Sequence, residues 1–199
     1  MTDVAAPVLP VADLLARPGI TVIVGAAATG KTMLLRELAR LAPRSHKWMP
    51  DAFDVALPDN HAADPDGWEE PHPLTNGGPM HLPLLLTREQ TLLIDAFSDL
   101  PLQGMRGWRD VARTCGHRII TTTQVTTALQ AALIDGSLAG TVSRIVVLLG
   151  SASVRPLLPA SLGLVPAAPA ALPGHAAVWD PADPASAVLQ RIPRLRITS

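Results

Sequence analysis

Residues 21–35 read TVIVGAAATGKTMLL, and this stretch decides the fold. The short β-branched run Gly19–Val24 predicts a buried strand. Leucines at three-to-four spacing predict a helix over Lys31–Ala42, which Pro43 ends. Between the two, residues 25–32 match the pattern G-x-x-x-x-G-K-[ST] in full. A strand, a loop of small residues and a helix in this order predict a loop that binds phosphates.

The chemistry of phosphate binding explains the residue types in this loop. Small residues let backbone N–H groups point toward the β-phosphate, and the helix N-terminus adds partial positive charge. We expect Lys31 to reach the β- and γ-phosphate oxygens, and the Thr32 hydroxyl to help hold Mg²⁺. A nucleotide with Mg²⁺ is therefore the predicted ligand of this loop. The predicted nucleotide-binding residues are Gly25, Ala26, Ala27, Ala28, Thr29, Gly30, Lys31, Thr32 and Met33. The alternative is a glycine turn before a buried helix.

Two further polar positions follow predicted strands. Thr91–Phe97 (TLLIDAF) reads as a buried strand with Asp95 near its carboxyl end. An acid there can position Mg²⁺, because ligands of open α/β sheets bind at that edge. His117–Gln124 reads as the next strand, and Gln124 is placed to contact a γ-phosphate or the attacking water. Either residue alone could be an ordinary polar strand end.

The rest of the chain predicts an α/β fold. Helical patterns over residues 107–116 and 126–136 alternate with strand patterns over residues 143–150 and 175–180. This alternation predicts a mostly parallel sheet with helices on both faces, in one domain spanning residues 1–199. The irregular parts are an insert at about 50–83 (with one short strand expected near 53–57), a Pro/Ala-rich segment at about 151–174 and a basic tail at 190–199.

Composition narrows the functional classes. The 199 residues carry a net charge of −1, so no overall field draws the protein toward nucleic acid or membrane. Polyanion binding would need a local patch or several subunits around one channel. Cys115 is the single cysteine, which excludes an intrachain disulfide and favours a reducing compartment. We expect no lipid span and no signal peptide.

Three segments together resemble a known family. They are Asp95-Ala96-Phe97-Ser98-Asp99-Leu100, the strand from Gly116 to Thr123-Gln124, and Arg144-Ile145 after a glycine-containing turn. With the Walker A loop they resemble the FtsK–HerA superfamily of DNA-pumping P-loop ATPases, over residues 19–151. In size the chain is similar to the genome-packaging ATPases of tailless, membrane-containing icosahedral viruses.

The resemblance implies a RecA-like core and a hexameric ring around double-stranded DNA, with ATP sites between subunits. It implies catalytic roles for Lys31, Asp95, Gln124 and Arg144, the last completing a neighbour's site; a surface arginine is the alternative at Arg144. It also implies capsid or viral membrane vertex proteins as partners. A viral protein of this kind would work in the host cytoplasm or the virion, and any other member in the cytoplasm.

One position departs from the family. The family has glutamate directly after the Asp95 position, where it polarises the attacking water, and this chain has Ala96. Losing such a general base costs about 10²–10⁴ in rate. Among the four glutamates, Glu89 precedes the strand, at its wrong end, and Glu37 lies more than a turn into the helix after the loop. Glu69 and Glu70 in the insert could fold back, and Asp99 is another possible substitute. Three explanations remain open. Another acid substitutes for the glutamate, the protein is a naturally weak ATPase, or the native residue was a glutamate that has been replaced by engineering.

Arginines supply candidate DNA contacts. Arg106, Arg109 and Arg113 recur at three and four residues, so they share one helical face. Six copies would form a basic ring that grips DNA phosphates; a solvated helix face is the alternative. Arg191, Arg194 and Arg196 form a second candidate set. The leading function is an ATP-driven double-stranded-DNA translocase. The alternatives are a small-molecule P-loop kinase and a non-hydrolysing nucleotide-binding assembly subunit.

Overall fold

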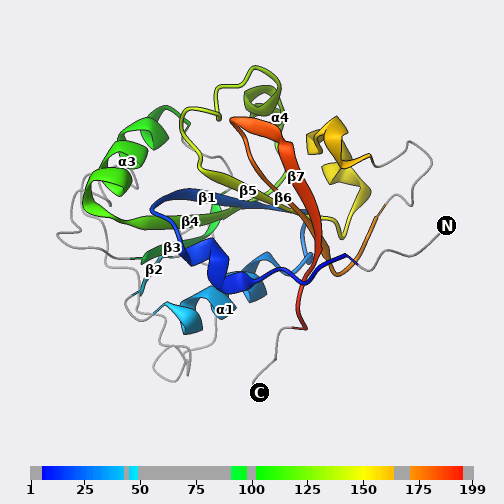
Figure 1. Ribbon diagram of the computed structural model, residues 1–199, viewed down its shortest axis with the longest axis horizontal. Coiled ribbons are helices and arrows are strands. Elements are labelled where there is room, and N and C mark those ends of the chain that lie inside the picture. The colour runs from blue at the N-terminus through cyan, green and yellow to red at the C-terminus, as the bar shows by residue number, and fades with distance from the viewer. Residues whose placement is uncertain (1–5, 43–44, 49–90, 98–101, 164–170, 195–199) are drawn as a thin grey trace.

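The strands of this protein form one mixed sheet. The computed structural model describes residues 6–42, 45–48, 91–97, 102–163 and 171–194 (Figure 1). Within these ranges seven strands lie in the order β2-β3-β4-β1-β5-β6-β7. Strands β1 to β5 run parallel, whereas β6 and β7 are antiparallel to their neighbours. Their bounds are β1 Gly19–Val24, β2 Ser45–Trp48, β3 Thr91–Phe97, β4 Arg118–Thr123, β5 Arg144–Leu148, β6 His175–Asp180 and β7 Asp183–Arg191.

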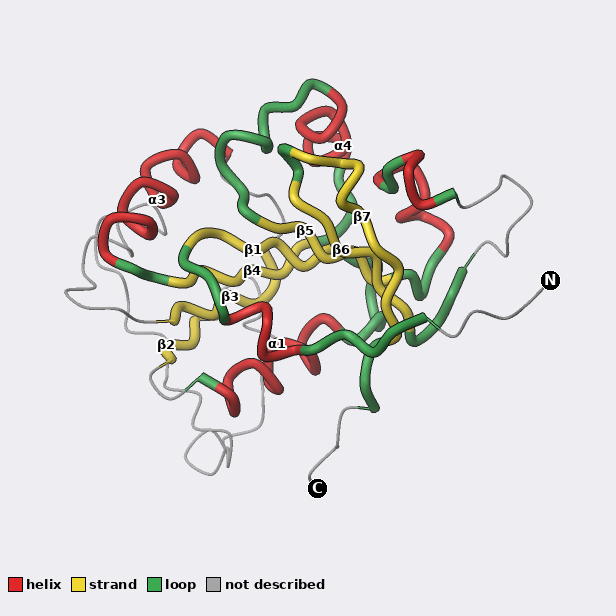
Figure 2. Tube along the Cα trace, in the orientation of Figure 1, coloured by secondary structure: helices red, strands yellow, loops and turns green. Residues whose placement is uncertain are grey.

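Helices cover both faces of the sheet (Figure 2). The α-helices are α1 Lys31–Leu41, α3 Leu102–Cys115 and α4 Thr127–Ile134, and the 3₁₀ helices are η1 Val11–Leu15, η5 Ala152–Leu157 and η6 Ala160–Leu162. Side chains of β1 alternate between two cores. Ile23 packs with Leu34 of α1, whereas Val22 belongs to the other core, with Trp108 of α3. All six residues of β1 are buried, as expected for a strand covered on both faces.

The structure confirms the predicted α/β fold with a mostly parallel sheet and helices on both faces. Helix α3 begins at Leu102, earlier than predicted, and β2 and β7 were not predicted. Residues 49–90, which include the predicted short strand near 53–57, lie outside the described residues. In the described part of the Pro/Ala-rich segment, η5 and η6 replace the expected irregular chain. None of the described helices is long and apolar enough to cross a bilayer.

The order of the parallel strands places the phosphate loop. Strand β1 lies between β4 and β5, and β4 separates it from β3. The carboxyl ends of β1, β3, β4 and β5 therefore share one edge of the sheet, which we call the P-loop edge. Their amino ends share the opposite edge. The sheet order therefore places the loop after β1 at the carboxyl edge of a mostly parallel α/β sheet.

Candidate nucleotide-binding site

The phosphate loop folds back on its own carbonyl groups. The Lys31 Nζ donates hydrogen bonds to the carbonyl oxygens of Gly25 (2.9 Å) and Ala26 (2.7 Å). The Thr29 hydroxyl donates to the same Ala26 oxygen at 2.9 Å. Two residues take left-handed backbone conformations, Ala28 with φ of 57° and Gly30 with φ of 92°. The loop thus curves around the Lys31 ammonium, which donates hydrogen bonds to two of its carbonyl oxygens.

Close packing around Thr29 favours glycine at two positions. A Cβ atom at Gly25 would lie 2.4 Å from the Thr29 hydroxyl oxygen. A Cβ atom at Gly150, which follows β5, would lie 3.0 Å from Thr29 Cγ2. The loop after β5 therefore touches the phosphate loop. The motif explains Gly25, but sequence reasoning missed Gly150, because only the pairing of β1 with β5 brings it to Thr29.

Helix α1 begins directly behind the loop. Its N-cap is Gly30, which has no side-chain capping hydrogen bond. The first N–H groups of a helix lack intrahelical acceptors and carry the positive end of the helix dipole. Lys31, Thr32 and Met33 form this first turn. An anion held by the loop would therefore meet backbone donors as well as the Lys31 ammonium.

Asp95 lies at a bulge in β3. Ile94 pairs with Thr121 and Phe97 pairs with Thr123, so Asp95 and Ala96 together face the single residue Thr122. The Thr122 hydroxyl donates a hydrogen bond of 2.6 Å to Asp95 Oδ1. Only 3% of Asp95 is exposed, and Thr122 is fully buried. Bulges commonly redirect a side chain next to an active site, and here the partner hydroxyl fixes the carboxylate.

Lys31 and Asp95 belong to one electrostatic site. Burial lowers the pKa of Lys31, and the negative charge of Asp95 acts in the opposite direction. A divalent cation suits this donor set, because Mg²⁺ prefers oxygen ligands and takes few from the protein when phosphates are present. The Asp95 carboxylate and the Thr32 hydroxyl are such oxygens, and Thr32 is exposed at the start of α1. The residues present therefore fit Mg²⁺.

Gln124 lies beside the phosphate loop. It follows β4 directly, where Thr123 pairs with Val24. The Gly25 N–H donates to the Thr123 carbonyl oxygen at 3.2 Å, which fixes the end of β4 to the first residue of the loop. The Gln124 side chain is exposed at the P-loop edge. Its predicted position next to the nucleotide site is thus compatible with the fold.

Of the four glutamates and Asp99, the structure describes only Glu37. Its carboxylate is 3.3 Å from the Arg40 guanidinium, one turn further along α1. The other four (Glu69, Glu70, Glu89 and Asp99) lie outside the described residues. Ala96 is the second residue of the bulge, directly after Asp95. Within the described residues, Glu37 is thus the single glutamate, and Arg40 is its partner.

Arg144 lies at the opposite edge, away from the phosphate loop of its own chain. It begins β5, where it pairs with Thr21, and its Nη1 donates to the Asp13 carbonyl oxygen at 2.6 Å. Arg109 and Arg113 of α3 line a cleft at this same edge. Arg106 belongs to α3, but its side chain is outside the described residues. Within one chain, then, the predicted site residues divide between the two edges of the sheet.

Comparisons with known proteins give a partial likeness of the backbone. No protein-family model matches the sequence, and no curated protein matches it. The cytoplasmic domain of the Thermomonospora curvata Type VII secretion ATPase EccC is similar with a TM-score of 0.48 and 16% identity, over 90% of this chain and 24% of that one. The VirB11 ATPase of the Brucella suis type IV secretion system, solved with sulphate, is similar with a TM-score of 0.44 and 16% identity, over 69% of this chain and 45% of that one.

The P4 protein of bacteriophage phi13 is similar with a TM-score of 0.43 and 13% identity, over 87% of this chain and 58% of that one. This chain thus spans between 24% and 58% of the length of these three proteins. At such identities and TM-scores the likeness concerns the arrangement of strands and helices, and it assigns no activity to this chain.

Proposed function

We propose that this chain binds ATP with Mg²⁺ and uses its hydrolysis to move double-stranded DNA, as a subunit of a ring that packages a viral genome. One observation carries the nucleotide part of the proposal. The phosphate loop and the buried, hydrogen-bonded Asp95 lie at the same edge of the sheet, close enough for Asp95 to influence the pKa of Lys31. The DNA part rests on the resemblance of residues 19–151 to DNA-pumping ATPases.

The residues of the loop divide the work of binding. Backbone N–H groups of residues 25–32 and the first turn of α1 bind the phosphates. The Lys31 ammonium exchanges the carbonyl oxygens of Gly25 and Ala26 for phosphate oxygens when nucleotide enters. Thr32 and Asp95 would hold Mg²⁺, which neutralises charge on the phosphates when bound. Thr122 keeps the Asp95 carboxylate in place.

In this proposal Gln124 contacts the γ-phosphate or the attacking water, and Arg144 completes the site of a neighbouring subunit. A position at the opposite edge, away from the phosphate loop of its own chain, is compatible with a role at the site of another copy. Mixing two inactive variants tests it. Lys31→Ala and Arg144→Ala chains should restore ATPase activity when mixed, since a mixed interface contains one intact site. No recovery in mixtures that still assemble would contradict a role in trans.

The DNA contacts in this proposal come from Arg106, Arg109 and Arg113 of α3, repeated around a hexameric ring. Contacts to phosphates give affinity without sequence preference. Capsid or viral membrane vertex proteins would dock the ring, in the host cytoplasm or in the virion.

The direct test of the proposed translocase is ATP hydrolysis by the purified protein with and without duplex DNA, with Lys31→Ala as the control. Hydrolysis that duplex DNA leaves unchanged would count against a translocase.

A specific observation favours a second candidate function, which is nucleotide binding without hydrolysis in an assembly subunit. Ala96 occupies the bulge position next to Asp95, and a methyl group cannot accept a proton. The two candidates differ in the Ala96→Glu variant. A translocase without a substitute acid gains activity from the added carboxylate, whereas a subunit that has lost hydrolysis altogether binds ATP and gains none.

A further inference from the structure

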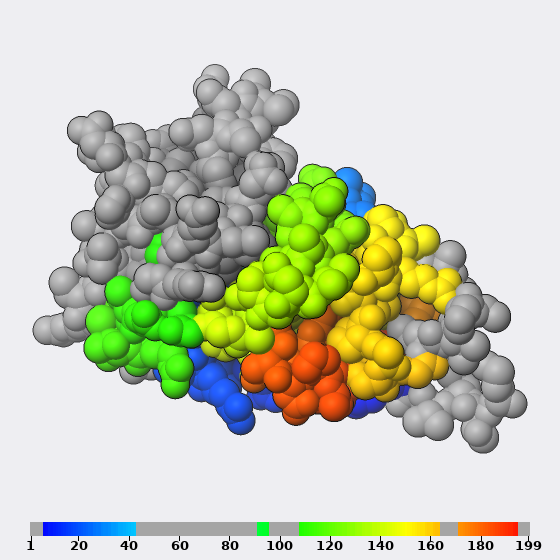
Figure 3. Space-filling view, turned by 90° about the horizontal axis from the view of Figure 1, so that it is seen from above, coloured from blue at the N-terminus to red at the C-terminus, as the bar shows by residue number. Residues whose placement is uncertain are grey.

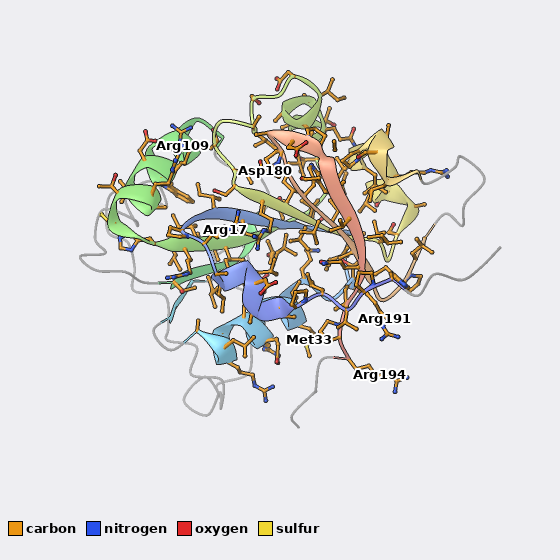
Figure 4. The ribbon with its side chains drawn as sticks, viewed as in Figure 1. Arg17, Met33, Arg109, Asp180, Arg191 and Arg194 are labelled. Carbon is orange, nitrogen blue, oxygen red and sulfur yellow. The ribbon has the colours of Figure 1, made fainter. Side chains whose placement is uncertain are left out.

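A cleft at the opposite edge of the sheet gathers arginines from three separate segments. It has a volume of about 840 Å³ and is lined by the turn between η1 and β1, the end of α3, the start of β5 and the β6–β7 hairpin. We call it the edge cleft. Its arginines are Arg17, Arg109, Arg113 and Arg144. In Figure 3 a blue N-terminal segment lies between the green α3 and the orange β6–β7 hairpin, and Figure 4 places Arg17 and Arg109 toward the same end of the strands.

Arg17 and Arg144 form the centre of this cleft. Arg144 is half-buried, and one of its nitrogens is engaged by the Asp13 carbonyl oxygen. Burial lowers the pKa of Arg144, and the positive charge of Arg17 lowers it further, whereas Asp13 and Asp180 act in the opposite direction. Within the described part of the chain, neither Arg17 nor Arg144 forms an ion pair with a carboxylate.

The nearby carboxylates have other partners. Asp180 Oδ1 accepts a hydrogen bond from the Ala182 N–H at 2.8 Å, and Asp183 Oδ1 accepts one from the Ala185 N–H at 3.2 Å. Both aspartates thereby hold the β6–β7 turn. In α3, Arg109 donates twice to Asp110, at 2.9 and 2.8 Å. Asp13, Asp180 and Asp183 also line the cleft, so its four arginines outnumber its three carboxylates by one.

We infer that the edge cleft is a phosphate-binding site, with Arg17 and Arg144 as its principal ligands and the α3 arginines at its rim. Arg17 and Arg144 line one cleft and repel each other, and Asp13 and Asp180 offset this repulsion in part. A bound anion would reduce it further. Phosphate suits the pair, because guanidinium groups bind its oxygens with two parallel hydrogen bonds. The phosphate could belong to a nucleotide or to the backbone of a nucleic acid, since the cleft chemistry is the same for both.

This site goes beyond the proposed function in two respects. Arg17 was not a candidate in the sequence, and in the structure it lines the same cleft as Arg144. The sequence divided the arginines between two ligands, DNA for Arg106, Arg109 and Arg113 and a neighbour's nucleotide for Arg144. The cleft contains Arg109, Arg113 and Arg144, so one class of ligand explains these three. The inference does not depend on hydrolysis by this chain.

The test uses full-length protein carrying Lys31→Ala, which weakens phosphate binding at the loop so that the remaining affinity reports on the edge cleft. The probes are inorganic tripolyphosphate, measured by calorimetry, and a short labelled DNA duplex, measured by fluorescence anisotropy. The added variants are Arg17→Gln and the double variant Arg17→Gln/Arg144→Gln. Arg36→Gln on α1 is the matched control, because this exposed arginine lies outside the cleft.

We expect Arg17→Gln to weaken at least one probe by about tenfold, and the double variant to weaken it more, because each loses charge-assisted hydrogen bonds. Arg17→Lys should restore part of the affinity, and Arg36→Gln should change nothing. Loss for tripolyphosphate alone identifies a nucleotide-type phosphate, and loss for the duplex identifies a nucleic-acid backbone.

Arg17→Gln also keeps the test sound if the double variant fails to fold. Arg17 is exposed, and it makes no hydrogen bond within the described residues, so its substitution should leave the melting temperature unchanged. If wild-type-like folding is retained and neither probe binds, or both bind with the same affinity after Arg17→Gln, the inference is overturned.

Discussion

Thr122→Val tests whether a buried hydroxyl holds the acid of the nucleotide site. The change keeps the size and β-branching of the side chain, which suit a buried strand, and removes the 2.6 Å hydrogen bond to Asp95 Oδ1. Because Thr122 is fully buried and Asp95 is 3% exposed, water cannot replace the donor easily. A hydrogen bond to a charged group contributes about 1.5–3 kcal/mol, so we expect the free energy of unfolding to fall by about this amount.

The matched control is Thr121→Val in the same strand. Thr121 is also fully buried, but its hydroxyl reaches only the Thr122 carbonyl oxygen, at 3.4 Å. Its loss should cost at most about 1 kcal/mol. Urea unfolding of both variants measures the difference. A second readout separates function from stability, because Thr122→Val should weaken ADP binding in the presence of Mg²⁺ more than in EDTA.

Equal effects of the two substitutions would refute this reasoning. They would mean that the Asp95 carboxylate is held by something other than Thr122, or that its orientation does not matter to the folded state. Unchanged binding of ADP with Mg²⁺ in a destabilised Thr122→Val protein would leave the hydrogen bond as a structural feature and remove Thr122 from the nucleotide site.

Three further predictions concern the phosphate loop and its neighbours. Gly150→Ala should weaken nucleotide binding, because the alanine Cβ would lie 3.0 Å from Thr29 Cγ2. Adding Thr29→Ser should restore binding, because it removes that methyl group. Failure of this rescue in a folded protein would count against the contact. Burial lowers the pKa of Lys31 below 10.5, so just below pH 10.5 the unfolded chain binds more protons than the folded one. The free energy of unfolding should therefore rise with pH in that range, and Lys31→Met should abolish the rise. An identical pH profile in the variant would argue against a perturbed lysine. Ala96→Glu should raise ATPase activity by about 10²–10⁴ if no substitute acid exists, and equal activity of both proteins would show that another residue activates the water.

Much of the fold was predictable because local patterns and tertiary structure agree. The β-branched run of β1, the loop motif and the leucines of α1 each carry a local signal, and the structure confirms the predicted strand and helix on either side of the loop. Asp95 was predictable as a strand-end acid. The same local reasoning missed β7, although the DPAD turn before it is a hairpin signal, because alanine, proline and serine in residues 183–187 suggest irregular chain.

The features that the sequence did not reveal depend on contacts between distant segments. The bulge at Asp95 and Ala96 arises from the register of β3 against β4, and nothing in TLLIDAF itself marks it. The approach of Gly150 to Thr29 follows from β5 lying next to β1. Arg17 and Arg144 are more than a hundred residues apart, so only the folded sheet brings them to one cleft.

The central claim is that the loop of residues 25–32 binds a nucleotide through its phosphates. Calorimetric titration of ATP with Mg²⁺ into the full-length protein and into its Lys31→Ala variant tests it most directly. The account predicts saturable binding that the variant weakens by about 100-fold or more, because two or more charge-assisted hydrogen bonds are lost. Equal affinity in the two proteins, or no binding to the folded wild-type protein, would contradict it.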